Sequence, residues 1–366
     1  MRKLVVGFLT LIFISGCKQN LLTDDQNNLI PSEDSLYIGG HFNISGNQSL
    51  SNIALWDGTD WSLLGSGVSG NNPNIECMTF YKGDLYVGGI FEIAGGAVVK
   101  NIAKWNGIHW SDVGGGINGR VTSLVEYNDE LYAGGWFSEA GNIQANNIAK
   151  WDGGNWSNVG IGFSDEVYAL CMYKNELYAG GWFTKNSSGY FNANNIARWN
   201  GVRWDSLMSG VYSDLSGGSW VKTISVFNDE LFVSGNFTHC GNLSVNNLAK
   251  WNNNIWGSVS DDTISDRTYS AVIFKDKYHL AGENDSHIIN FNQYYAVWNG
   301  TSFTFNNFLL DGAVYCLYSK DKYLFVGGNF LTVDGELVNG IFKWDGDKIT
   351  KLGLGVQGYV SSIISK

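Results

Sequence analysis

The sequence predicts an all-β protein, a seven-bladed β-propeller of four-stranded antiparallel blades, and three observations lead to this prediction. The chain of 366 residues has 47 Gly, 16% charged and 14% aromatic residues, a composition typical of many short strands joined by tight turns. A Leu-Tyr-x-Gly-Gly segment recurs roughly every 46 residues, a period typical of propellers and other repeat folds. Each period contains four short apolar runs separated by turn residues, without helical periodicity.

Copies of this repeat fill the chain after residue 35. We therefore expect a single propeller domain over residues 36–366, in which the sixth copy keeps least of the pattern. The Leu-Tyr-x-Gly-Gly anchor or its variant begins at Leu36, Leu85, Leu131, Leu177, Leu231, Tyr278 and Leu324.

The third copy indicates how one unit is built. Gly134-Gly135 lies in its second strand, where the missing side chains allow a close backbone approach. Asp152-Gly153 joins the third and fourth strands, and such a pair indicates a hairpin in which both turn residues have positive φ. The pair recurs as Asp-Gly or Asn-Gly in every unit except the fifth. The four strands are expected at 121–127, 131–137, 147–151 and 155–159, with a loop over 138–146.

The two ends of the repeat region complement each other. The first unit begins at Leu36, which is already a second-strand position, so this unit lacks a first strand. Residues 359–364 (YVSSII) align with the first strand of the other units. We expect this C-terminal strand to complete the N-terminal blade and close the ring, which removes open sheet edges.

The repeats resemble those of the kelch and galactose-oxidase-like propeller family. The matching features are Gly-Gly at the end of the second strand, an aromatic residue before a turn in the third, and a Trp in the fourth. The chain departs from that family because Trp-Asp or Trp-Asn stands where kelch repeats usually have Tyr-Asp. The resemblance implies the architecture and not an activity, because the copper ligands of galactose oxidase have no counterpart that we can place.

Residues 1–16 are predicted to be a bacterial lipoprotein signal peptide. Two basic residues precede an apolar segment, and Ile-Ser-Gly-Cys at 14–17 matches the pattern of an aliphatic residue, a small residue, Gly or Ala, and Cys. The resemblance implies cleavage before Cys17 and lipidation of that residue. The protein would then be anchored in the cell envelope, at the outer membrane, facing the periplasm or the exterior. An ordinary secretory signal is the alternative.

The remaining composition limits the partners. Residues 17–35 are expected to form a polar tether with little to bury. The net charge of −11 argues against nucleic acid, since phosphate binding needs clustered Lys and Arg. No cofactor is expected, and no metal, because the histidines lack metal-binding spacing. We expect a monomer with unpaired, buried thiols at Cys77, Cys171, Cys240 and Cys316.

Most tryptophans occur in pairs around the turn between the third and fourth strands. Flat aromatic rings can stack on sugars, so the pairs could indicate carbohydrate binding. One pair in nearly every unit is, however, what packing between blades requires, and we predict a structural role. The pairs are Trp56/Trp61, Trp105/Trp110, Trp151/Trp156, Trp199/Trp204 and Trp251/Trp256.

A ligand site is expected at repeat positions where the surrounding motif is kept but the residue itself differs between units. The position after Gly-Gly and the first position of the first strand vary, and both should surround the mouth of a central channel on one face. Aromatic faces and charges mixed in this way suit a sugar or an acidic peptide. Alternatively, the two tryptophans after Gly-Gly cover the glycines beneath them. The candidate ligand-binding residues are Trp136, Trp182, Arg120, Glu166, Trp220, Arg267 and Tyr359.

The function predicted from the sequence is that of a binding or scaffold module for a glycan or protein ligand on one propeller face. The near-perfect repetition and the lack of a recognisable catalytic motif favour this interpretation. The alternative is a carbohydrate-active enzyme, a polysaccharide lyase or a glycoside hydrolase, with its site at the channel mouth. No catalytic residue can be assigned from the sequence.

Overall fold

A computed structural model describes residues 35–189, 192–214, 217–259, 264, 267–283, 295–305 and 308–366. Within these ranges the ordered elements are all β-strands. The predicted signal peptide, Cys17 and all of the tether except Ser35 lie outside the described residues. Within the described part of the chain, no helical segment has the length and hydropathy needed to cross a lipid bilayer.

Each unit of the repeat folds as an antiparallel sheet whose strands follow one another along the chain. The third unit consists of β12 (Arg120–Tyr127), β13 (Glu130–Trp136), β16 (Ile148–Trp151) and β17 (Trp156–Asn158), close to the expected bounds. The second unit consists of β6 (Asn74–Tyr81), β7 (Asp84–Ile90), β10 (Ile102–Trp105) and β11 (Trp110–Asp112). The fourth consists of β18 (Val167–Tyr173), β19 (Glu176–Gly181), β20 (Ile196–Trp199) and β21 (Trp204–Ser206).

The later units repeat this order. The fifth consists of β23 (Trp220–Phe227), β24 (Glu230–Asn236), β27 (Leu248–Asn252) and β28 (Ile255–Ser258). The sixth consists of β29 (Thr268–Phe274), β30 (Lys277–Gly282), β31 (Tyr295–Trp298) and β32 (Phe303–Phe305). The seventh consists of β33 (Ala313–Lys320), β34 (Tyr323–Asn329), β37 (Ile341–Trp344) and β38 (Ile349–Lys351).

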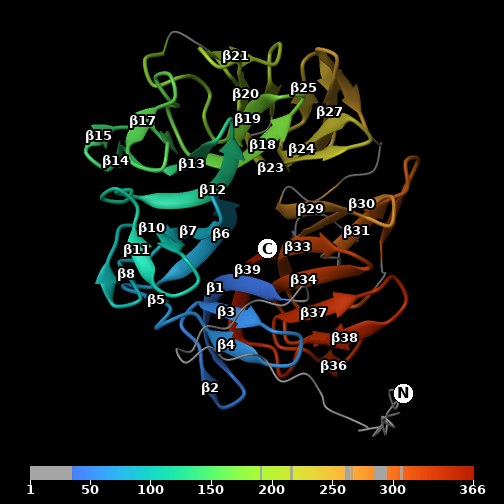
Figure 1. The fold of residues 1–366 in the computed structure, drawn as a ribbon. Coiled ribbons are helices and arrows are strands. Elements are labelled where there is room, and N and C mark those ends of the chain that lie inside the picture. Colours follow the sequence, from blue (N-terminus) through green and yellow to red (C-terminus); the bar gives the residue numbers. More distant parts are fainter. Residues whose placement is uncertain are drawn as a thin grey trace, which may run out of the picture. The chain divides into compact units, whose positions relative to one another are not determined.

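The first sheet is built from both ends of the described chain. It contains β1 (Leu36–Ser45), β3 (Ile53–Trp56) and β4 (Trp61–Leu63), and β39 (Gln357–Ile364) pairs with β1 along its other edge. Tyr37 lies opposite Ile364 in this ladder, so the end of β39 is beside the start of β1. Figure 1 shows β39 and β1 side by side.

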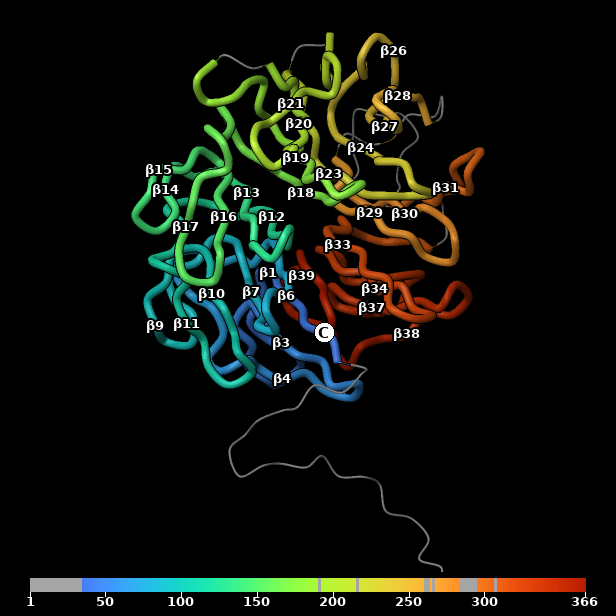
Figure 2. The backbone as a smooth tube through the Cα atoms, turned by 45° about the horizontal axis from the view of Figure 1, so that its top comes forward, coloured from blue at the N-terminus to red at the C-terminus, as the bar shows by residue number. Residues whose placement is uncertain are grey.

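The first strands contact one another in sequence. β6 contacts β12, which contacts β18, and the series continues through β23, β29 and β33 to β39, which contacts β6. These strands lie toward the middle of the arrangement, whereas fourth strands such as β11 and β38 lie at its outside (Figures 1 and 2). The all-β arrangement of repeated four-stranded sheets is consistent with a propeller.

The loops between second and third strands contain short hairpins that the sequence did not predict. In the third unit Gly141, with φ of +57°, turns the chain between two strands, and Ala140 is fully buried beside the turn. The expectation of a loop over 138–146 was wrong in part, because β14 (Glu139–Ala140) and β15 (Ile143–Gln144) form a short hairpin within it. The short strands in these loops are β2 (Gln48–Ser49), β8 (Ile93–Ala94), β9 (Ala97–Val98), β14, β15, β25 (His239–Cys240), β26 (Leu243–Ser244), β35 (Thr332–Val333) and β36 (Glu336–Leu337). β5 (Val68–Ser69) and β22 (Val211–Tyr212) precede first strands and pair with β8 and β25.

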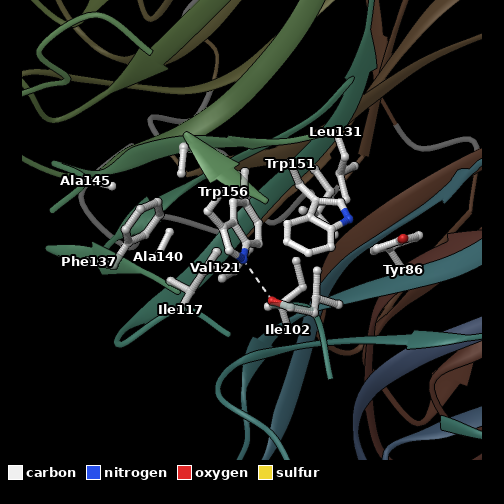
Figure 3. Close-up of a cluster of buried hydrophobic side chains, with 14 of the residues drawn as sticks. Tyr86, Ile102, Ile117, Val121, Leu131, Phe137, Ala140, Ala145, Trp151 and Trp156 are labelled. Carbon is white, nitrogen blue, oxygen red and sulfur yellow. Dashed lines mark hydrogen bonds between the residues drawn. The ribbon is translucent and has the colours of Figure 1, made fainter. Parts of the chain in front are cut away.

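The tryptophan pairs pack between neighbouring units, as predicted. Trp151 and Trp156 lie 5.4 Å apart between ring centroids and are both 7% exposed. The Trp156 indole N–H donates to the Val113 carbonyl of the preceding unit at 2.8 Å. Figure 3 draws a dashed line from the Trp156 indole nitrogen for this bond. The same bond to the preceding unit is made by Trp110 to Leu64, Trp204 to Val159, Trp256 to Leu207, and Trp61 of the first unit to Leu352 of the seventh.

The turns between third and fourth strands differ from the expected geometry. Gly153 has φ of +107°, but Asp152 does not have positive φ. The Asp152 side chain instead accepts hydrogen bonds from the backbone N–H groups of Gly154 and Asn155, both at 2.7 Å. The Asp or Asn is therefore selected because its side chain closes the turn. Positive φ at two successive residues occurs in the first turn of the unit, at Asn128 and Asp129.

A buried asparagine just before the third strand joins neighbouring units. Asn147 has φ of +64°, its side-chain oxygen accepts from the Phe137 N–H at 3.0 Å, and its amide donates to the Phe163 carbonyl at 3.0 Å. Asparagine combines left-handed backbone with both hydrogen-bonding roles. Equivalent pairs of bonds are made by Asn52, Asn101 and Asn247.

The four cysteines of the described chain are unpaired, as expected. Cys240 and Cys316 are buried, whereas Cys77 and Cys171 are half-buried, so burial is less complete than predicted. Burial raises the pKa of the Cys171 and Cys240 thiols to about 12. Thiols with such pKa values remain protonated and act as small apolar side chains.

A buried histidine should make stability depend on pH. His279 is 2% exposed, donates from Nε2 to the Phe274 carbonyl at 3.0 Å and pairs through Nδ1 with the Tyr295 hydroxyl. Burial lowers its pKa to about 4. Between pH 6.5 and 4 the unfolded chain therefore binds a proton that the folded chain does not. The free energy of unfolding should fall by up to about 3 kcal/mol over this interval as pH decreases.

Urea unfolding at several pH values measures this effect. His279→Phe should make the free energy of unfolding much less dependent on pH between pH 4 and 6.5, whatever its effect on stability at pH 7. His109→Gln, at an exposed turn position, should leave the dependence unchanged. If the free energy of unfolding changed with pH equally in the wild-type chain and in His279→Phe, the prediction would be wrong.

Candidate functional site

The residues predicted around the channel mouth lie together at one end of the sheets. Arg120 is opposite Trp136 in the ladder between β12 and β13, and Tyr359 is opposite His41 in the first sheet. Trp220 is opposite Asn236. The Glu166 carbonyl accepts from the Trp182 N–H at 2.9 Å, and the Arg267 carbonyl accepts from the Glu283 N–H at 3.0 Å. In these units the first position of the first strand thus meets the residue after Gly-Gly.

Glycine is required at this end of the sheet because the two strands approach closely. A Cβ atom at Gly135 would lie 2.0 Å from the Arg120 carbonyl oxygen. A Cβ at Gly134 would lie 2.7 Å from a methyl group of Val167, in the next unit. The Gly-Gly pair therefore permits both the strand pairing and the contact between sheets, and it places the following residue at the rim.

Arg120 joins carboxylates from two neighbouring units. Its Nε donates to both carboxylate oxygens of Glu76, at 2.8 and 2.9 Å, and its guanidinium also donates to Glu166 at 3.2 Å. Burial opposes the charge of Arg120, but the hydrogen bond and charge of Glu76 outweigh it and raise the pKa of Arg120. Burial raises the pKa of Glu166, against the opposing charges of Arg120 and Lys222. The predicted pair of Arg120 and Glu166 is thus part of a triad with Glu76.

A cavity of about 320 Å³ lies where the first strands begin. Its wall comes mainly from residues two positions after the start of each first strand. These residues were not predicted as site residues from the sequence. Alternation along a strand places positions i and i+2 on the same face, so this ring could have been found from the sequence. The lining residues are Asn74, Glu76, Arg120, Thr122, Tyr168, Lys222, Tyr269, Tyr315, Tyr359 and Ser361.

Lys222 occupies the aromatic part of this wall. Its Nζ lies 4.2 Å from the centroid of the Tyr168 ring and 5.6 Å from that of Tyr269, on the two neighbouring first strands. Both distances are within the range of cation–π attraction. Burial lowers the pKa of Lys222, the charge of Arg120 lowers it further, and Glu76 and Glu166 act in the opposite direction.

The tyrosines continue around the wall edge to face. Tyr269 and Tyr315 lie 5.3 Å apart between centroids, as do Tyr315 and Tyr359. The Tyr269 hydroxyl donates to Glu283 at 2.8 Å, and Glu283 also pairs with Arg267 at 3.3 Å. Burial raises the pKa of Tyr269, so its hydroxyl stays protonated at neutral pH. Of the predicted residues, Arg120 and Tyr359 line the cavity, whereas Arg267 is outside its lining and is connected to Tyr269 through Glu283.

The two tryptophans after Gly-Gly are exposed. Trp136 is 64% exposed and Trp182 is 46% exposed, whereas the paired Trp151 and Trp156 are each 7% exposed. Trp182 lies 5.5 Å from Trp220 between ring centroids, so these two predicted residues form an aromatic corner at the rim. Large exposed aromatic side chains beside a cavity are characteristic of ligand sites.

The described residues include no group of three or more His, Cys, Asp or Glu arranged to hold a metal ion. At the cavity, Glu76, Arg120 and Glu166 are engaged with one another, and Tyr269 is engaged with Glu283. This arrangement can bind a ligand by ring stacking, hydrogen bonds and charge.

No protein-family model matches the chain, and no curated protein matches it. Solved structures that are similar to most of it include the following two. The extracellular domain of BT4673 from B. thetaiotaomicron, described as a hybrid two-component system, has a TM-score of 0.57 and 12% identity, over 86% of this chain and 36% of that chain. The computationally designed protein Ika8 has a TM-score of 0.50 and 14% identity, over 82% of this chain and 93% of that chain. At these identities the likeness concerns the fold alone.

Proposed function

We propose that the protein is a closed seven-bladed β-propeller that binds a glycan or protein ligand on the face where its first strands begin. Closure is supported by the pairing of β39 with β1, and by the Trp61 hydrogen bond to Leu352 of the seventh unit. It is also supported by one buried cluster that contains Leu36 and Ile38 of the first unit with Ile341 of the seventh. A closed ring holds the loops of one face in fixed relative positions, which suits ligand binding.

One observation carries the binding role: Trp136 and Trp182 are exposed at the end of the sheets where the first strands begin, whereas the paired tryptophans are buried or half-buried. Trp136 lies opposite Arg120, which lines the cavity, although neither tryptophan is itself a lining residue. Burying a Trp face against a ligand releases a large apolar area from water, and Trp is enriched among residues that dominate binding energy. The repeat does not require an aromatic residue at this position, because Ile90, Asn236 and Asn329 occupy it in other units. A glycan is favoured because the aromatic faces adjoin hydrogen-bonding charged groups.

The location proposed is the bacterial cell envelope, with Cys17 lipidated and the propeller on the periplasmic or outer side of the outer membrane. The signal in residues 1–17 supports this location. The similar BT4673 structure is that of an extracellular domain, which agrees with export. The lipid would hold the chain at the membrane while the polar tether leaves the binding face accessible.

Glycan and peptide arrays probed with the soluble chain from Lys18 onward test the binding role. We expect Trp136→Ala and Trp182→Ala each to weaken binding at least about tenfold, because aromatic anchors typically contribute 2 kcal/mol or more. Ile255→Ala is the matched control, since Ile255 is 68% exposed but lies on β28, an outer strand. Binding that survives both tryptophan substitutions would show that Trp136 and Trp182 are not part of the binding site.

A carbohydrate-active enzyme is the second candidate, and the burial that raises the pKa of Glu166 is the observation in its favour. A general acid needs such a pKa, although Arg120 already pairs with this carboxylate. Incubation with cell-wall and plant polysaccharides, followed by product analysis, distinguishes catalysis from binding. Products released by the wild-type chain and lost in Glu166→Gln would favour the enzyme.

A further inference from the structure

Lys222 brings a positive charge into the cavity without a carboxylate partner. Among the residues that the structure describes, no carboxylate oxygen lies within 4.0 Å of its Nζ. Arg120 is different, because Glu76 and Glu166 together supply three of its contacts at 2.8 to 3.2 Å. The two nearby carboxylates are thus engaged with Arg120, and the Lys222 charge remains to be balanced.

The surroundings of Lys222 make this imbalance costly. The side chain is half-buried among Tyr168 and Tyr269, and an ammonium removed from water is stabilised most effectively by an anion that can approach it directly. Burial and the like charge of Arg120 both lower the pKa of Lys222. An anion bound in the cavity would stabilise the charged amine and oppose both effects.

The tyrosines define the shape of the group beside that anion. Tyr168 and Tyr269 flank Lys222, and Tyr315 and Tyr359 extend the aromatic wall edge to face. The Tyr269 hydroxyl is already bound to Glu283, so its ring is the part available to a ligand. Such rings accept the C–H face of a sugar. A cationic ligand is disfavoured there, because the positive charge of Lys222 lies over two of these rings and would repel it.

We propose that this cavity binds the carboxylate of an acidic sugar residue, such as a uronic acid, with Lys222 as the counter-ion and the tyrosines against the ring. This assignment rests on the proposed glycan-binding function and names its ligand class. The volume of about 320 Å³ is at the lower end of the range of about 300 to 1,000 Å³ for ligand pockets, which fits one sugar residue. The exposed tryptophans Trp136 and Trp182 then contact the next sugar residues of the bound glycan.

Calorimetric titration with defined oligosaccharides tests the assignment in the soluble chain from Lys18 onward. The probes are oligogalacturonate, its methyl ester and the neutral galactose oligomer, with the corresponding glucuronate series in parallel. Wild-type protein should bind an acidic oligomer at least about tenfold more tightly than its methyl ester, because esterification removes the charge that pairs with Lys222. Lys222→Met should abolish this preference, whereas Lys222→Arg should retain most of it.

Lys250→Met is the matched control, since it removes a lysine that pairs with Glu230 on the same sheet, outside the cavity. It should keep the wild-type preference for the acid. Modification of Lys222 by an amine-reactive reagent, followed by mass spectrometry, should also be slowed by the acidic oligomer. This second measurement uses unaltered protein, so it does not depend on the folding of a variant.

The outcomes separate this assignment from the general binding role. Neutral glycans that bind through Trp136 and Trp182, without a preference for the acid, would overturn the assignment and leave the binding face intact. An acid preference that persists in Lys222→Met would also overturn it. Binding of acidic oligomers that depends on Lys222 but not on the two tryptophans would support the cavity as the ligand site. It would contradict a contribution from the tryptophans. Binding of an acidic peptide such as hexaglutamate, with no uronate binding, would exclude the sugar.

Discussion

A chain that lacks residues 359–366 is expected to lose cooperative folding, with a loss of roughly 5 kcal/mol or more from the free energy of unfolding. Val360 is fully buried and Ile363 is 8% exposed, and each buried aliphatic side chain contributes roughly 1.5 to 3 kcal/mol. The deletion also removes most of the ladder along β1 and exposes Leu36 and Ile38. The total is comparable with the stability of a typical domain. Guanidinium unfolding followed by circular dichroism measures the effect.

Two further chains show whether the loss comes from the missing strand. Removal of Ser365 and Lys366 alone should cost about 1 kcal/mol, since it removes the hydrogen bond of Ser365 to Tyr318 and the contact of the exposed Lys366 with the Phe80 ring. A circular permutant that begins before β39 and joins residue 366 to residue 35 by a short turn should unfold like the wild-type chain. The permutant should fold because Ile364 lies opposite Tyr37, so the two ends that the turn joins are already close together. Cooperative unfolding of the shortened chain at unchanged guanidinium concentration would refute closure of the ring by β39.

Trp156→Ala is expected to reduce the free energy of unfolding by about 3 to 5 kcal/mol, the usual cost of truncating a large buried aromatic side chain. Trp156 fills the space between two units and donates its indole N–H to the Val113 carbonyl at 2.8 Å. Trp156→Phe retains most of the ring but leaves that carbonyl without its donor, so a smaller loss of about 1 to 3 kcal/mol should follow. Thermal and urea unfolding of the three chains measure the difference.

Trp136→Ala is the matched comparison, because it deletes the same side chain from a position that is 64% exposed in the same sheet. Its effect on the free energy of unfolding should stay within about 0.5 kcal/mol. The two tryptophans are thus expected to separate stability from binding. Similar losses of stability for Trp136→Ala and Trp156→Ala would show that exposure does not distinguish their roles.

The strands were largely predictable because their signals are local. The alternation of apolar residues and the Gly-Gly pair set the strand bounds of the third unit to within about two residues, which is the usual uncertainty of element ends. The turn residues were also found, but with the wrong geometry. Asp152 closes its turn through its side chain, which positional preference alone does not distinguish from positive φ.

The candidate site was predicted only in part. Trp136 and Arg120 were placed at one end of the sheet because the repeat gives their register, and the ladder pairs them directly. Lys222 was missed because in the sequence it is one of many lysines on strands. Its importance depends on Tyr168 and Tyr269, which belong to two other units.

The sequence by itself determined the repeat, the four strands of each unit and the buried role of the paired tryptophans, since these depend on spacing along one chain segment. Only the tertiary structure decided which charges meet. Glu76 and Glu166 lie 44 and 46 residues from Arg120 in the sequence, and their distances from it in space depend on how neighbouring sheets pack. The repeat period determines which residues each unit contributes to an interface. The attraction between two charges, however, weakens over a few ångströms, so the ion pairs can be identified only once the sheets are packed.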